Sequence, residues 1–273
     1  MRTSLATAVS AIAQNPLRAA VIATALLSLF FLLLPDVDIA VSRLFYEPGA
    51  GFPLADVPFL QDLRALNRFL MRLIGVCAGG ALLAWMLIRR LRARFDVRAP
   101  VFLLSTLALG PWLMVNIILK GYWGRARPVQ TDVFGGESPF SNVWQIVDHC
   151  QTNCSFTSGE AASAAWLFAL VFIAPVAWRR TMSIGIGLFA VAASFNRILF
   201  GGHFLSDVLL SWTLIFAVLL LLRWVIYKRP PKWLERPRLE AALARAGDAV
   251  VARSRRAAGK LRAARKRAFD TLR

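Results

Sequence analysis

The sequence predicts an all-α, polytopic membrane protein with six transmembrane helices. Hydrophobic residues make up 58% of the 273 residues, and the mean hydropathy is +0.56. A soluble domain is closer to one half apolar, so much of this chain is expected to face lipid. Six apolar stretches approach the length of about 20 residues that crosses a bilayer core. They lie at 19–34, 69–88, 100–119, 161–178, 182–200 and 204–227.

The first stretch lies where a secretory signal would lie. It lacks a clear small-residue cleavage site, and further apolar stretches follow it. We therefore expect an uncleaved first transmembrane helix.

Basic residues in the short connections predict the orientation. Five arginines follow the second stretch, and two follow the fourth: Arg89, Arg90, Arg92, Arg94 and Arg98, then Arg179 and Arg180. These connections are expected to be cytoplasmic, as are both termini. The loops at 35–68, 120–160 and 197–204 then face outward.

The composition changes sharply after the last stretch, which predicts a transmembrane domain at 1–227 and a basic cytoplasmic tail at 228–273. The tail holds 15 Lys and Arg against 4 acidic residues. A basic segment next to a membrane helix is attracted to anionic lipids, and the tail carries no nucleic-acid-binding motif. We expect membrane lipids as its partner and no nucleic acid. A membrane-surface helix and a disordered tail both remain open.

The outer loop at 120–160 contains two of the three cysteines, Cys150 and Cys154. An oxidising compartment would allow them to form a disulfide. Free thiols are the alternative. A zinc site with the adjacent His149 is less favoured, because four ligands at a usual spacing are not present. No metal and no cofactor are expected.

Three polar clusters lie at the outer ends of the apolar stretches. Charged residues at such positions are costly in lipid and therefore indicate function. The clusters comprise Lys120, Arg125, Arg127 and Pro128; Ser158, Gly159 and Glu160; and Asn196, Arg197, His203 and Asp207.

The residue types in these clusters are those needed for phosphate transfer. His203 and Asp207 share a helix face, so Asp207 can accept the hydrogen of one ring nitrogen while the other attacks phosphorus. Lys120, Arg127 and Arg197 can hold the phosphate oxygens. At a helix N-terminus, the Ser158 hydroxyl and the Gly159 amide can meet an anion. A structural His-Asp pair, headgroup anchors and ordinary helix capping are the competing interpretations.

Together the clusters resemble the three-part signature of the type 2 phosphatidic acid phosphatase superfamily: K-x6-R-P, P-S-G-H and S-R-x5-H-x3-D. The first motif matches at Lys120, Arg127 and Pro128, and the third at Arg197, His203 and Asp207, with Asn196 in place of serine. The resemblance implies a helical bundle of that superfamily in the bacterial inner membrane. It also implies a metal-free site at the periplasmic face that acts on a lipid-linked phosphate through a phosphohistidine.

The second motif departs from the signature, because Glu160 replaces the histidine that serves the family as general acid. Glu160 can donate a proton only if its surroundings favour the protonated form. His149 is a second candidate for this role, and Arg125 is an auxiliary candidate. A site using Glu160 is expected to prefer acidic conditions or a good leaving group.

The predicted function is hydrolysis of a phosphate monoester or pyrophosphate of a lipid, of the lipid A, undecaprenyl diphosphate or phosphatidate type. Two alternatives remain: phosphoryl transfer to a lipid acceptor at the same site, and lipid binding with weak catalysis.

Overall fold

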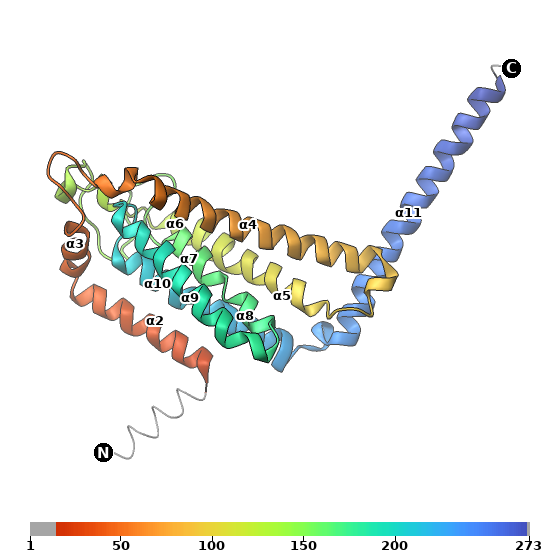
Figure 1. Ribbon diagram of the computed structural model, residues 1–273, viewed down its shortest axis with the longest axis horizontal. Coiled ribbons are helices and arrows are strands. Elements are labelled where there is room, and N and C mark those ends of the chain that lie inside the picture. Colours follow the sequence, from red (N-terminus) through yellow and green to blue (C-terminus); the bar gives the residue numbers. More distant parts are fainter. Residues whose placement is uncertain (1–14, 272–273) are drawn as a thin grey trace, which may run out of the picture. The chain divides into compact units, whose positions relative to one another are not determined.

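The computed structural model describes residues 15–271, which are entirely helical apart from loops and two isolated bridges, Glu47 with Gly51 and Thr131 with Ser138 (Figure 1). The chain divides into two compact units. One comprises the residues up to 75 together with 102–223, and the other comprises 76–101 and the residues from 224 onward.

The first unit is built around α10 (Leu205–Arg223). This helix contacts five neighbours: α2 (Pro16–Leu33), α3 (Asp36–Arg43), η3 (Ala108–Leu119), α7 (Gly159–Trp166) and α9 (Val176–Leu199). Its buried positions include both polar and apolar residues, Asp207 and Ser211 as well as Leu210, Ile215 and Leu219. The polar end of α10 therefore begins inside the protein.

Two further helices reach into this unit, α4 (Pro58–Leu87) and α5 (Arg98–Leu107). The helix of α5 continues as the wider π-helix η3 and then α6 (Lys120–Tyr122). Pro111 has no amide hydrogen, so one backbone hydrogen bond inside η3 is missing. The Asn116 side chain donates to the Pro111 carbonyl at 2.7 Å. Short 3₁₀ turns lie in the loops at η1 (Pro53–Asp56), η4 (Pro128–Gln130) and η5 (Asp132–Phe134).

Within residues 15–271, five helices are long and apolar enough to cross a membrane, so five of the six expected spans are found there: Pro16–Leu33, Pro58–Leu87, Arg98–Tyr122, Val176–Leu199 and Leu205–Lys228. They cover five of the six apolar stretches. Large apolar side chains on them are exposed, among them Leu26, Val76 and Leu188. Such surfaces suit contact with lipid.

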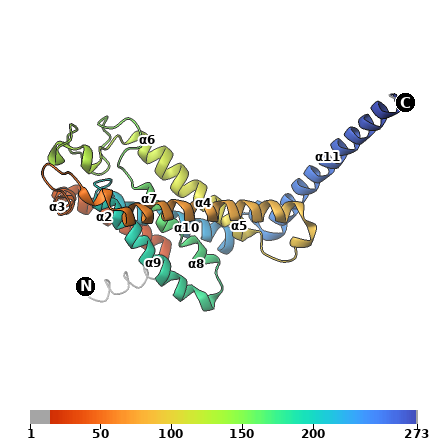
Figure 2. The same ribbon diagram turned by 45° about the horizontal axis from the view of Figure 1, so that its top comes forward.

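The expected span at 161–178 differs from the structure. It contains α7 and the short α8 (Ala169–Ile173), and together the apolar segment Gly159–Ile173 is shorter than a full span. Pro175 explains the early end, because it holds Ala174 in an extended conformation and starts α9, the next helix (Figure 2). The small residues of α7, from Ala161 to Ala165, are buried against other helices.

The second unit contains the end of α4, η2 (Arg89–Leu91), the start of α5, η6 (Trp224–Lys228), η7 (Lys232–Leu234) and α11 (Arg236–Thr271). Arg92 binds Asp248 of α11 at 2.8 Å and the Met86 carbonyl at 2.7 Å. A side chain at Gly247 would collide with the Met86 backbone, so glycine permits this close approach.

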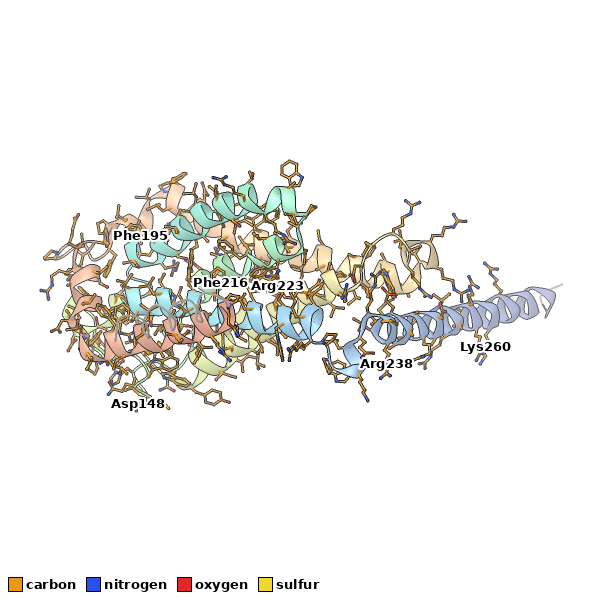
Figure 3. The ribbon with its side chains drawn as sticks, turned by 90° about the horizontal axis from the view of Figure 1, so that it is seen from below. Asp148, Phe195, Phe216, Arg223, Arg238 and Lys260 are labelled. Carbon is orange, nitrogen blue, oxygen red and sulfur yellow. A yellow bond between two sulfur atoms is a disulfide. The ribbon has the colours of Figure 1, made fainter. Side chains whose placement is uncertain are left out.

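Most of the described part of the predicted tail is the long helix α11, which η7 precedes. Basic side chains such as Arg238 and Lys260 project from it (Figure 3). Residues 272–273 of the tail lie outside the described residues.

Candidate active site

A glycine turn between α9 and α10 positions His203. Gly201 has φ +57°, and a Cβ atom there would overlap the Phe52 ring. The amides of Gly202 and His203 both donate to the Arg197 carbonyl, at 3.0 and 3.2 Å. The chain therefore folds back over the end of α9 and brings His203 beside Arg197.

The tautomer of His203 follows from its hydrogen-bond partner. Nδ1 lies 2.8 Å from the backbone carbonyl oxygen of Ser155, and a carbonyl oxygen only accepts. Nδ1 therefore carries the hydrogen, and Nε2 keeps a free lone pair. A neutral histidine in this tautomer can act as a nucleophile.

Asp207 was expected to accept the Nδ1 hydrogen directly, and the structure differs on this point. Asp207 Oδ2 lies 3.7 Å from Nδ1, too far for a hydrogen bond. Ser155 lies between them: its hydroxyl donates to Asp207 Oδ2 at 2.5 Å and is 3.4 Å from Nδ1. The carboxylate therefore acts on the ring at close range but through Ser155.

Burial lowers the pKa of His203 to about 3. The protonated ring would lose its hydration and would face the positive charges of Lys120 and Arg197, and Asp207 opposes these effects only in part. The ring is consequently neutral at physiological pH, which keeps Nε2 available.

Arg125 holds Asp207 in place from the opposite side. Its Nη1 donates to Asp207 Oδ1 at 2.7 Å, and its Nη2 donates to Asp38 Oδ2 at 2.9 Å. Ser206 completes this buried cluster, since its amide and hydroxyl donate to Asp38 at 2.8 and 2.5 Å. Arg125 is 1% exposed, and both carboxylates are fully buried.

The charges in this cluster are mutually dependent. Burial acts to lower the pKa of Arg125, but the charges of Asp207 and Asp38 outweigh it and raise the pKa above its ordinary value. Burial raises the pKa of Asp38, and the Arg125 charge opposes that rise. One guanidinium therefore serves two carboxylates, and the auxiliary candidate Arg125 has a supporting position behind Asp207.

Two of the predicted phosphate-binding residues meet at Asn153. The Lys120 ammonium donates to Asn153 Oδ1 at 3.1 Å, and Arg127 Nη2 donates to its carbonyl at 2.7 Å. Asn153 has φ +51°, a conformation that asparagine tolerates well. It lies in the loop closed by the Cys150–Cys154 disulfide, whose Cα atoms are 5.6 Å apart.

The second cluster lies beside Lys120. A Cβ atom on Gly159 would come within 3.4 Å of Lys120 Cε. The Ser158 hydroxyl caps α7 by accepting from the Ala161 amide at 3.3 Å. Ser158 is therefore occupied by capping in this structure, whereas Gly159 allows the ammonium to approach the helix.

Glu160 lies between two arginines. Its Oε1 is 2.7 Å from Arg64 Nε, and its Oε2 is 3.0 Å from Arg197 Nε. Asn67 of α4 donates to the Glu160 carbonyl at 2.9 Å and so ties the two helices together. A carboxylate held by two guanidinium groups is an acceptor and not a proton donor.

His149 has no hydrogen bond or ion pair with the His203 cluster among residues 15–271. Its Nδ1 is buried without a hydrogen-bond partner, and its carbonyl accepts from Ser138. Of the two candidate acids, Glu160 forms an ion pair with a predicted phosphate-binding residue, Arg197.

Four supporting residues were not found from the sequence: Asp38, Arg64, Asn153 and Ser155. Asp38 and Arg64 are far from the motifs in sequence. Only the fold brings Asp38 to Arg125 and Arg64 to Glu160. Asn153 and Ser155 flank Cys154, so their position beside a cysteine of the outer loop was the one available signal.

Comparisons with known proteins identify a family. Residues 99–231 match the PAP2 superfamily. A lipid A 4′-phosphatase of Rhizobium leguminosarum is 36% identical over 209 residues, covering 69% of this chain and 88% of that protein. A lipid A 4′-phosphatase of Francisella tularensis subsp. novicida is 31% identical over 203 residues, covering 73% and 88%.

A solved structure supports the fold. The chain resembles the crystal structure of a transmembrane PAP2 type phosphatidylglycerolphosphate phosphatase from Bacillus subtilis, with a TM-score of 0.53 and 20% identity. The match covers 78% of this chain and 97% of the other.

Fold and similarities together define a multi-pass membrane enzyme, a lipid phosphatase. The chain belongs to the PAP2 superfamily, so the resemblance in its motifs is confirmed.

Arg125→Met tests the buried ion cluster. It leaves Asp38 and Asp207 without a countercharge, and removing one partner of a buried pair costs about 3–5 kcal/mol. We expect a large fall in the thermal unfolding temperature in detergent micelles, followed by circular dichroism. Adding Asp38→Asn should recover part of the loss. An Arg125→Met protein as stable as wild type would contradict this account.

Acid titration tests the burial of His203. An unfolded histidine takes a proton near about pH 6.5, whereas the folded ring does so at about 3. Between these two pKa values only the unfolded state binds the proton. The stability that the neutral buried ring contributes is therefore complete above the unfolded pKa and is lost as the pH falls toward the folded pKa. His203→Gln, which keeps a donor for Ser155, should lose stability less steeply from about pH 7 to 4. Equal slopes in chemical unfolding of the two proteins would rule out a neutral buried ring.

Proposed function

We propose that this membrane lipid phosphatase removes the 4′-phosphate of lipid A. The substrate is supported by the names of its relatives, including the lipid A 4′-phosphatase of Rhizobium etli, which is 37% identical over 209 residues. The chemistry is supported by one observation above all. Nε2 of His203 is unprotonated in a site whose cations, Lys120 and Arg197, act on the same ring.

The proposed reaction has two steps. Nε2 of His203 attacks phosphorus as the phosphorus–oxygen bond to the sugar breaks, and the sugar oxygen takes a proton from an acid. Water then attacks the phosphohistidine, the phosphorus–nitrogen bond breaks, its electron pair returns to Nε2, and a water proton restores the acid.

Four groups support these steps. Lys120, Arg127 and Arg197 neutralise the phosphoryl oxygens, which is the main source of catalysis in phosphoryl transfer. Asp207 stabilises the cationic phosphohistidine through Ser155, since its negative charge lies 3.7 Å from the ring.

Glu160 is the proposed acid, and its proton has to arrive with the substrate. In the free protein Glu160 is ion-paired with Arg64 and Arg197. A phosphate that takes over Arg197 releases one carboxylate oxygen and places a negative charge next to it, which favours protonation. Proton delivery is thus coupled to phosphate binding.

We further propose six membrane crossings, with α7 and α8 as the crossing that is too short to qualify by length. The supporting argument is charge: Arg90 and Arg180 lie in the basic connections that a cytoplasmic location would suit. Both termini would then be cytoplasmic and the site would face the periplasm.

Phosphate release tests the proposed chemistry. We expect purified protein to release phosphate from lipid A and His203→Ala to release none, because the nucleophile is lost. Undecaprenyl diphosphate, phosphatidate and a lipid acceptor for transfer complete the panel. Mass spectrometry of the lipid products separates loss of the 4′-phosphate from loss elsewhere and from transfer.

Variants of Glu160, measured in the same phosphate-release assay, test whether Glu160 is the general acid. Glu160→Gln should reduce release, since it cannot donate the required proton, and Glu160→His should move the optimum toward neutral pH. Equal release by wild type and His203→Ala would refute the phosphohistidine. Full activity of Glu160→Gln would remove Glu160 from the mechanism.

Cysteine labelling tests the orientation. In a Cys77→Ala background, a membrane-impermeant maleimide should label Ala50→Cys on intact spheroplasts. It should label Arg90→Cys and Arg180→Cys only after permeabilisation. All three side chains are exposed in the structure. Labelling of Arg180→Cys on intact spheroplasts would show that α7 and α8 do not cross.

A further inference from the structure

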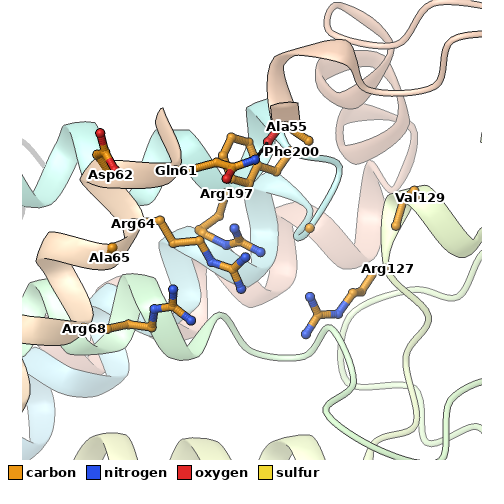
Figure 4. A pocket seen from close by; sticks show the side chains of 11 residues that line it. Ala55, Gln61, Asp62, Arg64, Ala65, Arg68, Arg127, Val129, Arg197 and Phe200 are labelled. Carbon is orange, nitrogen blue, oxygen red and sulfur yellow. Dashed lines mark hydrogen bonds between the residues drawn. The ribbon is translucent and has the colours of Figure 1, made fainter. Parts of the chain in front are cut away.

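Four arginines line one open pocket of about 500 Å³ next to the active site. Arg64 and Arg68 come from α4, whereas Arg127 and Arg197 belong to the phosphate-binding motifs. Figure 4 shows their guanidinium groups pointing into the same space. The pocket therefore extends the phosphate site toward α4.

The two arginines of α4 differ in their partners. Arg64 is paired with Glu160 at 2.7 Å. Arg68, one helical turn farther along the same face, is exposed and makes no hydrogen bond or ion pair within residues 15–271. Arg68 is close enough for its charge to act on Arg197. It is thus an unpaired cation at the wall of the pocket.

Positive charges gathered in this way repel one another, and a bound anion relieves the repulsion. Glu160, at the border of the pocket, forms ion pairs with two of the four guanidinium groups, those of Arg64 and Arg197. Asp62 lines the pocket but forms no ion pair within residues 15–271. The motif residues, Arg127 and Arg197, are enough to hold the reacting phosphate together with Lys120. Arg68 remains available for a different group.

Arg68 lies outside the part of the chain that carries the family motifs. It lies before residue 99, where the match to the PAP2 superfamily begins, and on a helix that supplies none of the three motifs. A residue placed outside the motifs but within the same pocket is well situated to select the substrate.

We propose that Arg68, with Arg64, forms a second anion subsite that binds another negatively charged group of the same lipid headgroup. The ligand chemistry is a phosphate or carboxylate oxygen, which a guanidinium group binds with paired hydrogen bonds. This inference rests on the proposed function, since it requires a lipid phosphate in the active site. It makes the enzyme selective for headgroups with more than one anion.

The test compares two lipids with identical acyl chains, a disaccharide lipid with only the 4′-phosphate and the same lipid with a second phosphate. Wild type should have the higher kcat/KM for the doubly charged lipid. Arg68→Ala should reduce this preference about tenfold, the loss expected for one charge-assisted interaction. Arg68→Lys should restore part of it.

Arg72→Ala is the matched control, because Arg72 lies one turn beyond Arg68 on α4, is also exposed and does not line the pocket. It should keep the wild-type preference. Equal effects of Arg68→Ala and Arg72→Ala would overturn the subsite and indicate general attraction by the basic surface. A third lipid, with a carboxylate in place of the second phosphate, distinguishes the two sources of the anion.

Lipid binding, measured without hydrolysis, tests the subsite independently of the proposed reaction. If wild type releases phosphate from neither lipid, the proposed function fails, and titration of the protein with each lipid in micelles then decides the subsite. Tighter binding of the doubly charged lipid that Arg68→Ala removes would support it. Equal binding of the two lipids, or a preference that survives Arg68→Ala, would overturn it.

Discussion

The buried contact between Arg125 and two carboxylates is the constraint on which the site depends. One guanidinium binds Asp38 of α3 and Asp207 of α10, and its Nε donates to the Ser141 carbonyl of the outer loop at 3.0 Å. Phe204, next to His203, lies against the same guanidinium, with its ring centre 4.5 Å away. Segments that are distant in sequence are therefore joined at one planar group, which suits arginine better than lysine.

The site consequently contains two groups of charges that both act on His203. In one group, Asp207 and Asp38 share Arg125 and are shielded from solvent. In the other group, Lys120 and Arg197 are nearly buried, and the Nε and Nη1 atoms of Arg197 make no hydrogen bond with correct geometry in the described chain. Glu160 offsets part of this positive charge. A phosphate would enter a region already organised for negative charge.

The sequence predicted much of the fold because lipid imposes a simple length rule on apolar helices. At 161–178 the structure departs from this rule, because the rule counts apolar residues and cannot tell a helix that faces lipid from one that faces protein. The small residues of α7 are buried by neighbouring helices, and Pro175 divides the stretch.

The motif residues could be proposed from the sequence for a similar reason, because charge at a membrane helix end is rare enough to stand out. The residues that orient them were not. Asp38 and Arg64 lie in segments where acidic and basic residues are ordinary, and only the folded chain gives them partners. The direct bond from Asp207 to His203 was predicted from helical spacing alone. Ser155 intervenes from a loop whose path no spacing rule describes.

The small ring closed by the Cys150–Cys154 disulfide restrains the local backbone more than it stabilises the whole protein. The bridged cysteines are only four residues apart, and the entropy that a crosslink removes from the unfolded chain grows with the length of the closed loop. A ring of this size adds little to the stability of the whole protein. Its effect is to limit the backbone freedom of Asn153, whose carbonyl and side chain contact Arg127 and Lys120. If the two cations bind a phosphate as proposed, the bridge reduces the conformational entropy that binding has to remove from this loop.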